Sequence, residues 1–283
     1  MDVINPKTTE DLLTFISENQ DSDFRFGAGY TDLLLELKEN PQLDLKIINL
    51  AQLNDTMFND IIDYGDYIHV GANVTAQELI ETTLISSNYP TLVESAESVA
   101  SVQIRNVATI GGNICTASPS GDMSCALISL QSICEILNSK GELREEYLCD
   151  FIQGVRKTSL AKNEVLRNVK IPKNITDQLH SGFVKIGTRN SMEISIVSLA
   201  YHLQINELGK IEKAGVSIGS VSPRIPFTEA ACTYLQGKIY NDLTSEERKE
   251  FAEKVLGFAT PISDIRASDW YRKEVLYNIS REL

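Results

Sequence analysis

The sequence lacks the close cysteine pairs that build many metal centres. It has five cysteines (Cys115, Cys125, Cys134, Cys149 and Cys232), and no two of them are spaced as CxxC. Zinc ribbons and plant-type iron–sulfur sites need such close pairs, so neither kind of site is predicted. An odd number of cysteines without a paired pattern indicates buried free thiols in a reducing compartment.

Long apolar runs and excess positive charge are also missing. No stretch approaches the roughly 20 apolar residues that cross a bilayer, and the polar start "MDVINPKTTEDLL" is unlike a secretory signal. We therefore expect a cytoplasmic protein that does not enter a membrane. The sequence has 26 Lys and Arg residues and 39 Asp and Glu residues, which give a net charge of −13. This balance repels phosphate backbones and disfavours nucleic acid as a partner, but it leaves room for a local positive pocket.

Histidine is scarce as well. His69, His180 and His202 are scattered along the chain, and the sequence shows no acid–base triad. A single histidine on a strand is more often structural than catalytic, although the three could still converge in space. We therefore predict no catalytic residues.

The 283 residues suffice for one large domain or two medium ones. In the first part of the chain, short apolar runs alternate with glycine turns and amphipathic stretches, a βαβ-like rhythm typical of α/β structure. The expected elements are a helix from Lys7, strands around residues 24–26, from 43 and from 67, helices over 31–38 and after Thr75, a buried helix and strand in 122–139, a turn at Lys140 and Gly141, and a strand ending at Pro172.

The pattern changes near Ile175, where we place a domain boundary. Three apolar stretches follow, "GFVKIG", "EISIVSLAYHLQIN" and "KAGVSIGSV", and they predict a small antiparallel sheet. Three helical stretches close the chain, beginning at Thr228, Thr244 and Ser268. The expected fold class is α+β with an α/β N-terminal part, divided into residues 1–175 and 176–283.

Two glycine-containing segments are the candidate ligand-binding loops. "NVATIGGNICTASPSGD" holds adjacent glycines and small hydroxyl residues, and "FGAGYTD" lies just before a predicted helix. Glycine lets a backbone approach a ligand closely, and successive N–H groups favour phosphate. The Rossmann fingerprint is absent, because Asp32 stands where its third glycine should be, and so is the Walker loop. Each segment alone also fits an ordinary turn, so spacing indicates only a candidate phosphate site.

Five ordered blocks, from about Lys7 to Leu276, resemble the FAD-binding medium subunits of molybdenum hydroxylases, the family of xanthine dehydrogenases, aldehyde oxidases and carbon monoxide dehydrogenases. "RNVATIGGNICTASPSGD" is similar to the family signature, and "AGYTDLLLELK" to a first loop that usually reads AGGTDLL. "LCDFIQGVRKTSLAKNEVLRNVKIP", "FVKIGTRNSMEISIVSLA" and "DIRASDWYRKEVL" resemble its later blocks.

The resemblance implies a fold like that of vanillyl-alcohol-oxidase-type (PCMH-like) flavoproteins. Two subdomains, about 1–55 and 56–175, would hold FAD, and a C-terminal domain like that of carbon monoxide dehydrogenase flavoproteins would follow. It also implies cofactor-binding residues. Phe26, Gly27, Ala28, Gly29, Tyr30, Thr31, Asp32 and Leu33 would line the pyrophosphate together with Thr109, Ile110, Gly111, Gly112 and Asn113. Thr116, Ser118 and Asp122 would contact the ribityl region, with Ala100, Leu166 and Lys185 touching other parts of FAD.

Three of these positions leave alternatives open. Asp122 is equally suited to cap the helix that follows it, and Lys185 fits a solvated strand position. Tyr30 stands where the family usually has a second small residue, so its side chain must point away from the phosphates or stack on FAD.

By the same resemblance, the protein is an electron-transfer subunit of an FAD-dependent oxidoreductase complex. Electrons would arrive from [2Fe–2S] clusters on a small subunit, substrate would be hydroxylated on a molybdopterin-binding large subunit, and NAD+, dioxygen or a quinone would accept the electrons. A dimer of heterotrimers is the expected assembly. No iron–sulfur cluster is expected in this chain. Two alternatives stay open: a stand-alone FAD oxidoreductase of the same fold, and a flavin-free scaffold subunit.

Overall fold

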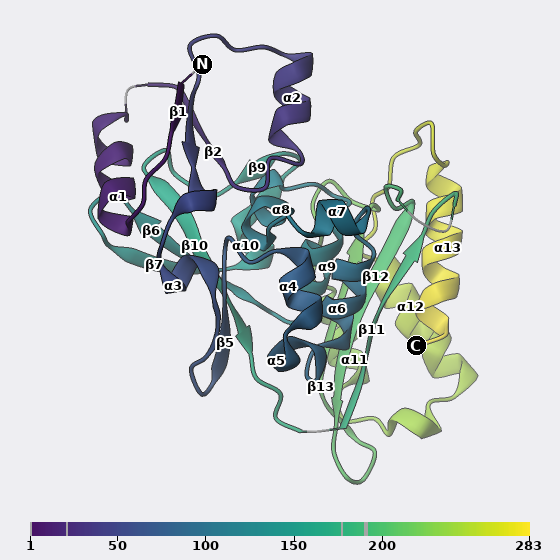
Figure 1. Cartoon of the computed structure of the whole chain (residues 1–283). Coiled ribbons are helices and arrows are strands. Elements are labelled where there is room, and N and C mark those ends of the chain that lie inside the picture. Colours follow the sequence, from purple (N-terminus) through teal and green to yellow (C-terminus); the bar gives the residue numbers. More distant parts are fainter. Residues whose placement is uncertain (1, 21, 177, 190–191) are drawn as a thin grey trace.

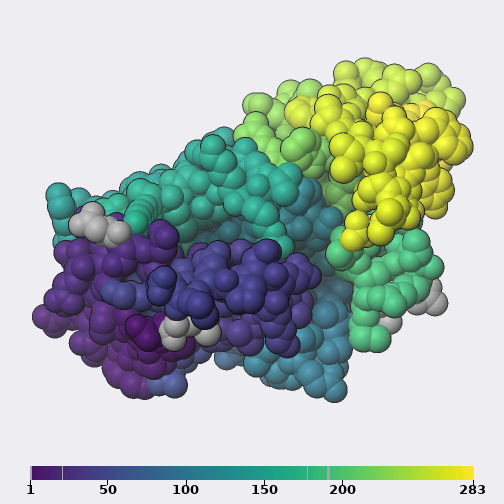
Figure 2. All heavy atoms as spheres, turned by 90° about the horizontal axis from the view of Figure 1, so that it is seen from above, coloured from purple at the N-terminus to yellow at the C-terminus, as the bar shows by residue number. Residues whose placement is uncertain are grey.

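The computed structural model describes residues 2–20, 22–176, 178–189 and 192–283. These residues form three sheets of three or more strands, which follow one another across the molecule (Figure 1). From above, the N-terminal residues and the C-terminal helices lie at opposite ends, with the central part of the chain between them (Figure 2). Within these ranges, no helix has both the length and the apolar character needed to cross a bilayer.

The first sheet is parallel and confirms the predicted alternation of strands and helices. Its strand order is β1-β3-β2, and β3 pairs in parallel with both neighbours. Thr8 caps α1 by accepting a hydrogen bond from the Asp11 N–H, so this helix starts where the polar sequence indicates. The elements are β1 (Asp2–Ile4), α1 (Thr9–Glu18), β2 (Phe24–Gly27), α2 (Leu33–Glu39) and β3 (Lys46–Asn49).

The second sheet departs from the expected rhythm, because all of its pairings are antiparallel. The strand β5 pairs with β10, about a hundred residues later, so the helices between them do not connect parallel neighbours. The strands, in spatial order, are β4 (Ile61–Asp63), β5 (Tyr67–Gly71), β10 (Glu164–Pro172), β6 (Ile133–Asn138) and β7 (Leu143–Tyr147).

Short helices fill the segment between β5 and β6. Thr75 caps α4 with a capping box, as predicted, and α9 is buried along its whole length. These helices are α4 (Ala76–Glu81), α5 (Thr83–Ser86), α6 (Pro90–Glu97), α7 (Val102–Arg105), α8 (Ile110–Thr116) and α9 (Asp122–Ser129). The remaining elements of this part are η1 (Leu50–Gln52), α3 (Thr56–Asn59), α10 (Leu148–Phe151), β8 (Ile152–Gly154) and β9 (Lys157–Thr158).

The third sheet confirms the antiparallel prediction, with strand order β11-β12-β13. One face packs against α6 and α9, and the other is covered by the C-terminal helices (Figure 1). The elements are β11 (Gln178–Ile186), β12 (Val197–Ile205), β13 (Ile211–Gly219), α11 (Glu229–Leu235), η2 (Tyr240–Asp242), α12 (Ser245–Leu256) and α13 (Asp269–Arg281).

The two faces of this sheet differ in character. On β12, Leu199 and Leu203 join the core under the C-terminal helices, whereas Ala200 belongs to the core of the N-terminal part. The inner face is small and polar, and a Cβ on Gly215 would lie 1.8 Å from the carbonyl oxygen of Ser129 at the end of α9. The backbones of the sheet and of α9 are therefore in direct contact at this point.

His202 lies on this inner face and is buried. Its Nε2 lies 2.7 Å from Asn174 Oδ1, and its Nδ1 lies 2.9 Å from Ser181 Oγ. Asn174 uses its amide nitrogen on the Asn88 carbonyl, so its Oδ1 accepts the imidazole proton and the Ser181 hydroxyl donates to Nδ1. His202 is thus a neutral structural residue that fixes the link between the second and third sheets.

The other histidines and the cysteines have separate surroundings. His69 packs against Tyr64 with the two rings tilted, and His180 lies between the rings of Tyr201 and Tyr240. The cysteines in the described residues are free, and most are buried as predicted, but Cys115 is exposed and corrects that expectation. In the same residues no group of three or more His, Cys, Asp or Glu side chains is arranged to hold a metal ion.

Candidate cofactor site

The two glycine loops lie side by side. A Cβ on Gly29 would lie 1.8 Å from the carbonyl oxygen of Val107, which leads into the second loop. Further along, the Thr116 hydroxyl lies 3.3 Å from Asp32 Oδ2, so α8 and the start of α2 are joined as well. Phe26 and Gly27 end β2, Ala28 to Asp32 form the turn, and Leu33 is buried at the start of α2. The chain thus brings the predicted loops together from positions about 80 residues apart.

The adjacent glycines of the second loop have different surroundings. Gly111 is buried, and a Cβ there would lie 2.7 Å from both the Cβ and the carbonyl oxygen of Ala72. Gly112 is exposed, and a Cβ there would approach only the Thr109 hydroxyl oxygen, at 2.9 Å. Thr109 caps α8 by accepting a hydrogen bond from the Gly112 N–H at 3.0 Å. Gly111 is therefore small for packing, whereas Gly112 leaves an open backbone surface.

Tyr30 turns back over its own loop. Its φ is +58°, in the left-handed region that glycine adopts without cost, so the backbone itself favours glycine at this position. The ring covers Gly27 and packs beside the buried Leu33, Leu45 and Ile47. Tyr30 therefore points along its own subdomain.

This backbone conformation makes a stability prediction. Tyr30→Gly and Tyr30→Ala both remove the ring, but only glycine relieves the left-handed strain. We expect the glycine variant to be more stable than the alanine variant by about 1 kcal/mol, the reverse of the order in ordinary helices and strands. Urea unfolding of the two variants measures this difference, and a more stable alanine variant would contradict the left-handed assignment.

A cavity of about 650 Å³ opens beside the second loop. It lies between the N-terminal part and the segments that follow β11 and precede α13. Its charged residues are Asp122, Lys185, Arg189, Glu193 and Arg266, a positive excess inside an acidic protein. The other lining residues are Val99, Ala100, Asn113, Ser120, Thr188, Met192, Ile194 and Ile196. The cavity thus contains four predicted residues: Ala100, Asn113, Asp122 and Lys185.

A buried ion pair forms the floor of this cavity. Lys185 Nζ lies 2.7 Å from Asp122 Oδ2 and 3.2 Å from the Ser98 carbonyl oxygen. Burial raises the pKa of Asp122 although Lys185 opposes the shift, and Asp122 Oδ1 has no hydrogen-bond partner in the structure. Gly121 is the N-cap of α9 and Asp122 its first residue, without a side-chain cap bond, so the capping alternative is wrong. The solvated alternative for Lys185 is also wrong, because its side chain is only 15% exposed.

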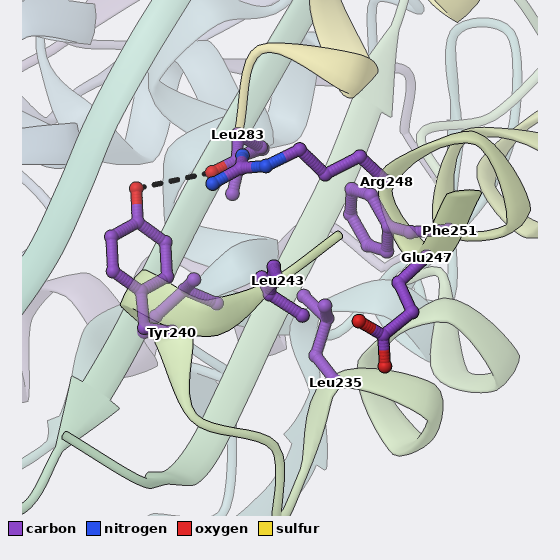
Figure 3. Close-up of a pocket in the computed structure, with 8 residues that line it drawn as sticks. Leu235, Tyr240, Leu243, Glu247, Arg248, Phe251 and Leu283 are labelled. Carbon is purple, nitrogen blue, oxygen red and sulfur yellow. Dashed lines mark hydrogen bonds between the residues drawn. The ribbon is translucent and has the colours of Figure 1, made fainter. Parts of the chain in front are cut away.

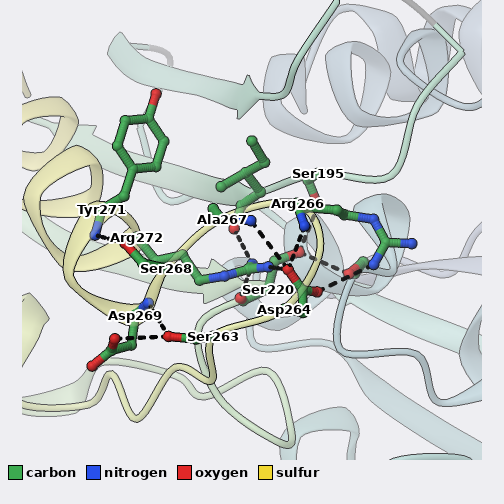
Figure 4. A network of polar contacts seen from close by, with 12 residues as sticks. Ser195, Ser220, Ser263, Asp264, Arg266, Ala267, Ser268, Asp269, Tyr271 and Arg272 are labelled. Carbon is green, nitrogen blue, oxygen red and sulfur yellow. Dashed lines mark hydrogen bonds and ion pairs between the residues drawn. The ribbon is translucent and has the colours of Figure 1, made fainter.

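A second network holds the far wall of the cavity (Figure 4). The buried Arg272 donates to the carbonyl oxygens of Ile196 and Ser220, at 2.6 and 2.9 Å, and pairs with Asp264 at 2.8 Å. Burial alone would raise the pKa of Asp264, but the N–H groups of Arg266 and Ala267 and the Arg272 guanidinium outweigh it and lower the pKa to about 2. This anchor fixes both the Ile196 strand end and the Arg266 loop.

Several wall residues were not predicted. Arg189, Glu193 and Arg266 lie within the blocks "FVKIGTRNSMEISIVSLA" and "DIRASDWYRKEVL", and this resemblance to the family is the sequence signal for them. Residues 190 and 191 of the first block lie outside the described residues. Of the predicted residues, Ser118 accepts a hydrogen bond from the Ser120 N–H, and Leu166 is buried in the core away from the cavity lining.

A second hollow, under α12, has no such chemistry. Its volume of about 10 Å³ holds at most one water molecule. Figure 3 shows it between Leu235, Leu243 and Phe251, beside the hydrogen bond from Tyr240 to the Leu283 carbonyl at 3.0 Å. It is a packing defect of the C-terminal core.

Comparison with known families gives this site its context. Residues 1–174 match the family model described as the FAD binding domain in molybdopterin dehydrogenase. The chain belongs to the FAD-binding medium subunits of molybdenum hydroxylases. Residues 183–282 match the CO dehydrogenase flavoprotein C-terminal domain. FAD is thus the cofactor of this subunit, which is part of an oxidoreductase, as the resemblance implied.

Relatives of this FAD subunit span nearly the same length. The xanthine dehydrogenase FAD-binding subunit of Escherichia coli is 26% identical over 98% of this chain and 92% of its own. The glyceraldehyde dehydrogenase medium chain of Sulfolobus acidocaldarius is 27% identical over 96% and 93%.

Solved structures confirm the fold class. The CO dehydrogenase of Oligotropha carboxidovorans contains a chain that is 23% identical, with a TM-score of 0.91 over 100% of this chain and 95% of that one. A chain of quinoline 2-oxidoreductase from Pseudomonas putida is 24% identical, with a TM-score of 0.88 over 100% and 94%. The FAD subunit therefore has the predicted α+β fold, with a PCMH-like FAD-binding domain followed by a C-terminal domain with a small antiparallel sheet.

The residues present fit FAD. The open surface at Gly112 leaves room for a ligand against the backbone, and Asn113 belongs both to this loop and to the cavity. The unpartnered Asp122 Oδ1 is an acceptor that suits a sugar-like hydroxyl or a ring N–H. The positive excess of the cavity favours the electron-rich form of a flavin.

Proposed function

We propose that this FAD subunit transfers electrons within a larger molybdenum hydroxylase complex. In this proposal, electrons come from [2Fe–2S] clusters on a small subunit and leave to NAD+ or another acceptor. A separate large subunit carries molybdopterin, and the assembly is a dimer of heterotrimers. The family match and the names of the relatives support the medium-subunit role. The cytoplasmic location stays a prediction.

We further propose how the chain holds FAD. The turn from Phe26 to Leu33 and the loop from Thr109 to Asn113 hold the diphosphate, and Thr116 and Ser118 lie along the path toward the cavity. Asp122 contacts the ribityl region, Ala100 touches another part of FAD and Lys185 lies near the flavin ring, while Leu166 is the predicted contact that the cavity does not support. The juxtaposition of Gly29 and Val107 carries this proposal, because it joins the two loops into one surface. We also retain the domain boundary near Ile175, with subdomains of about 1–55 and 56–175 before residues 176–283.

When bound, FAD supplies the redox chemistry of the subunit, and the protein positions and tunes it. The buried Lys185–Asp122 pair is the chain's own means of doing so, because its position in the cavity places a fixed cation and a fixed anion near the cofactor. The anchor at Arg272 keeps the opposite wall in place.

Substitution of Lys185 tests this assignment. Lys185→Ala removes a cation from the cavity, so reduction of the flavin, which adds negative charge to it, becomes less favourable. We expect FAD to stay bound while its midpoint potential falls by about 30 mV, which corresponds to about 1.4 kcal/mol for a two-electron couple. Spectroscopic redox titration of the purified flavoprotein measures the shift.

Lys173 offers a matched control. It forms a comparable pair with Asp63 at 2.6 Å but is 38% exposed and does not line the cavity. Lys173→Ala should leave the potential unchanged. An unaltered potential in Lys185→Ala would return Lys185 to a purely structural role.

The stand-alone oxidoreductase differs from this proposal in one measurable respect. Such an enzyme would oxidise its own substrate without partner subunits, whereas the transfer subunit needs its electron donor. Within the cavity Lys185 is paired with Asp122, and Arg266 is paired with Asp264 outside the lining, so these groups are engaged in structural ion pairs, which favours the transfer role.

A further inference from the structure

The two FAD loops are also joined on their outer side, through a hairpin outside both loops. The hairpin of β8 and β9 turns at Val155 and Arg156, and Arg156 has a φ of +57°. Its N–H donates to the Ala117 carbonyl oxygen at 3.0 Å, at the C-terminal end of α8. The hairpin tip is thereby attached to the helix that begins at the second loop.

The Arg156 side chain then reaches the other loop. Its Nη1 donates to Asp32 Oδ2, and its Nη2 donates to Asp32 Oδ1 at 3.2 Å. Asp32 Oδ2 also accepts the Thr116 hydroxyl, and hydrogen bonding to Arg156 lowers the pKa of Asp32. Arg156 therefore contacts the end of α8 through its backbone N–H and the start of α2 through its guanidinium, and it lies 124 residues from Asp32 in the sequence.

Charge makes direct phosphate binding by Asp32 unfavourable. A carboxylate beside a diphosphate repels it, yet Asp32 lies at the end of the loop that holds this group. The Arg156 guanidinium balances the negative charge of the Asp32 carboxylate, and the ion pair links two segments of the chain. We propose that Arg156 and Asp32 form a clasp, meaning this one ion pair, that keeps the two loops closed on FAD and slows its release.

The clasp rests on the proposed diphosphate site. It assigns Asp32 and Arg156 as positioning residues, because they act through the loops that they join. The pair is about half-exposed, at 54% and 43%, so its contribution is modest and sensitive to salt.

Release of FAD from the full chain tests the clasp. Arg156→Ala and Asp32→Ala should each speed FAD release about three- to fivefold at low salt, and the double variant should release FAD no faster than either. The swapped pair Asp32→Arg/Arg156→Asp should restore part of the slow release. Release is timed by trapping free FAD with an excess of a flavin-free FAD-binding protein.

Arg25 is the matched control. It pairs in the same fork geometry with Glu36, at 2.7 and 3.0 Å, but both partners belong to the first subdomain. Arg25→Ala should leave release unchanged, and melting of the flavin-free protein should fall no further in Arg156→Ala than in Arg25→Ala.

Three results would overturn the clasp. They are slower release in Asp32→Ala, additive effects of the two single variants, and unchanged release in Arg156→Ala. Failure of the diphosphate site itself is distinguishable, since Gly112→Val would then keep its FAD.

Discussion

Gly112→Val is expected to yield a folded protein that has lost its FAD. The Gly112 backbone is exposed and a side chain there meets only Thr109 Oγ1, so the valine side chain occupies the space assigned to the diphosphate. Hydrogen bonds to charged groups contribute about 1.5–3 kcal/mol each, so losing two of them weakens binding about 100-fold or more. The flavin absorbance of the purified chain and its melting temperature measure the two halves of this prediction.

The neighbouring glycine gives the contrast. Gly111→Ala places a methyl group 2.7 Å from Ala72, inside the protein, and should lower stability instead of affinity. Gly112→Ala, with its small Cβ, should lose FAD only in part. Normal FAD content in Gly112→Val would remove the second loop from the cofactor site.

Acidification is expected to destabilise the protein through His202. Burial, with a smaller effect from Lys213, lowers the pKa of His202 from 6.5 to about 4 in the folded state. Between pH 4 and pH 6.5, His202 is protonated in the unfolded chain but stays neutral in the folded protein. The contribution of the neutral His202 to the free energy of unfolding is therefore complete above pH 6.5. It falls by about 3 kcal/mol as the pH decreases to about 4.

Urea unfolding at pH 7.5 and pH 4.5 measures this loss. His202→Gln should be less stable at pH 7.5, but it should lose less of its remaining stability on acidification. His69→Gln is the control, because His69 is only half-buried and should leave most of the pH dependence in place. Parallel pH curves for the wild type and His202→Gln would show that this imidazole does not carry the effect.

Local pattern sufficed for much of the fold. The helices predicted from Lys7 and after Thr75 and the apolar stretch that forms β12 could be predicted directly, because each depends on neighbours within a few residues. Pairing between β5 and β10 depends on contacts about a hundred residues apart, and the βαβ-like rhythm gave no hint of its antiparallel direction.

The candidate site divides in the same way. The glycine loops were visible because backbone exposure requires glycine. The direction of Tyr30, the Asp122–Lys185 pair and the walls around Arg189 and Arg266 were not, because each depends on how remote segments meet. Spacing could not separate the packing glycine Gly111 from the open Gly112, which differ only in what surrounds them.

The backbone contact between Gly215 and Ser129 has a consequence for the evolution of this subunit. A single added methyl at position 215 would clash with the Ser129 carbonyl oxygen, so the third sheet, which also carries Lys185, and α9 would have to move relative to each other. We therefore expect substitutions at this contact to change the surroundings of the flavin indirectly, without replacing any residue that touches the cofactor.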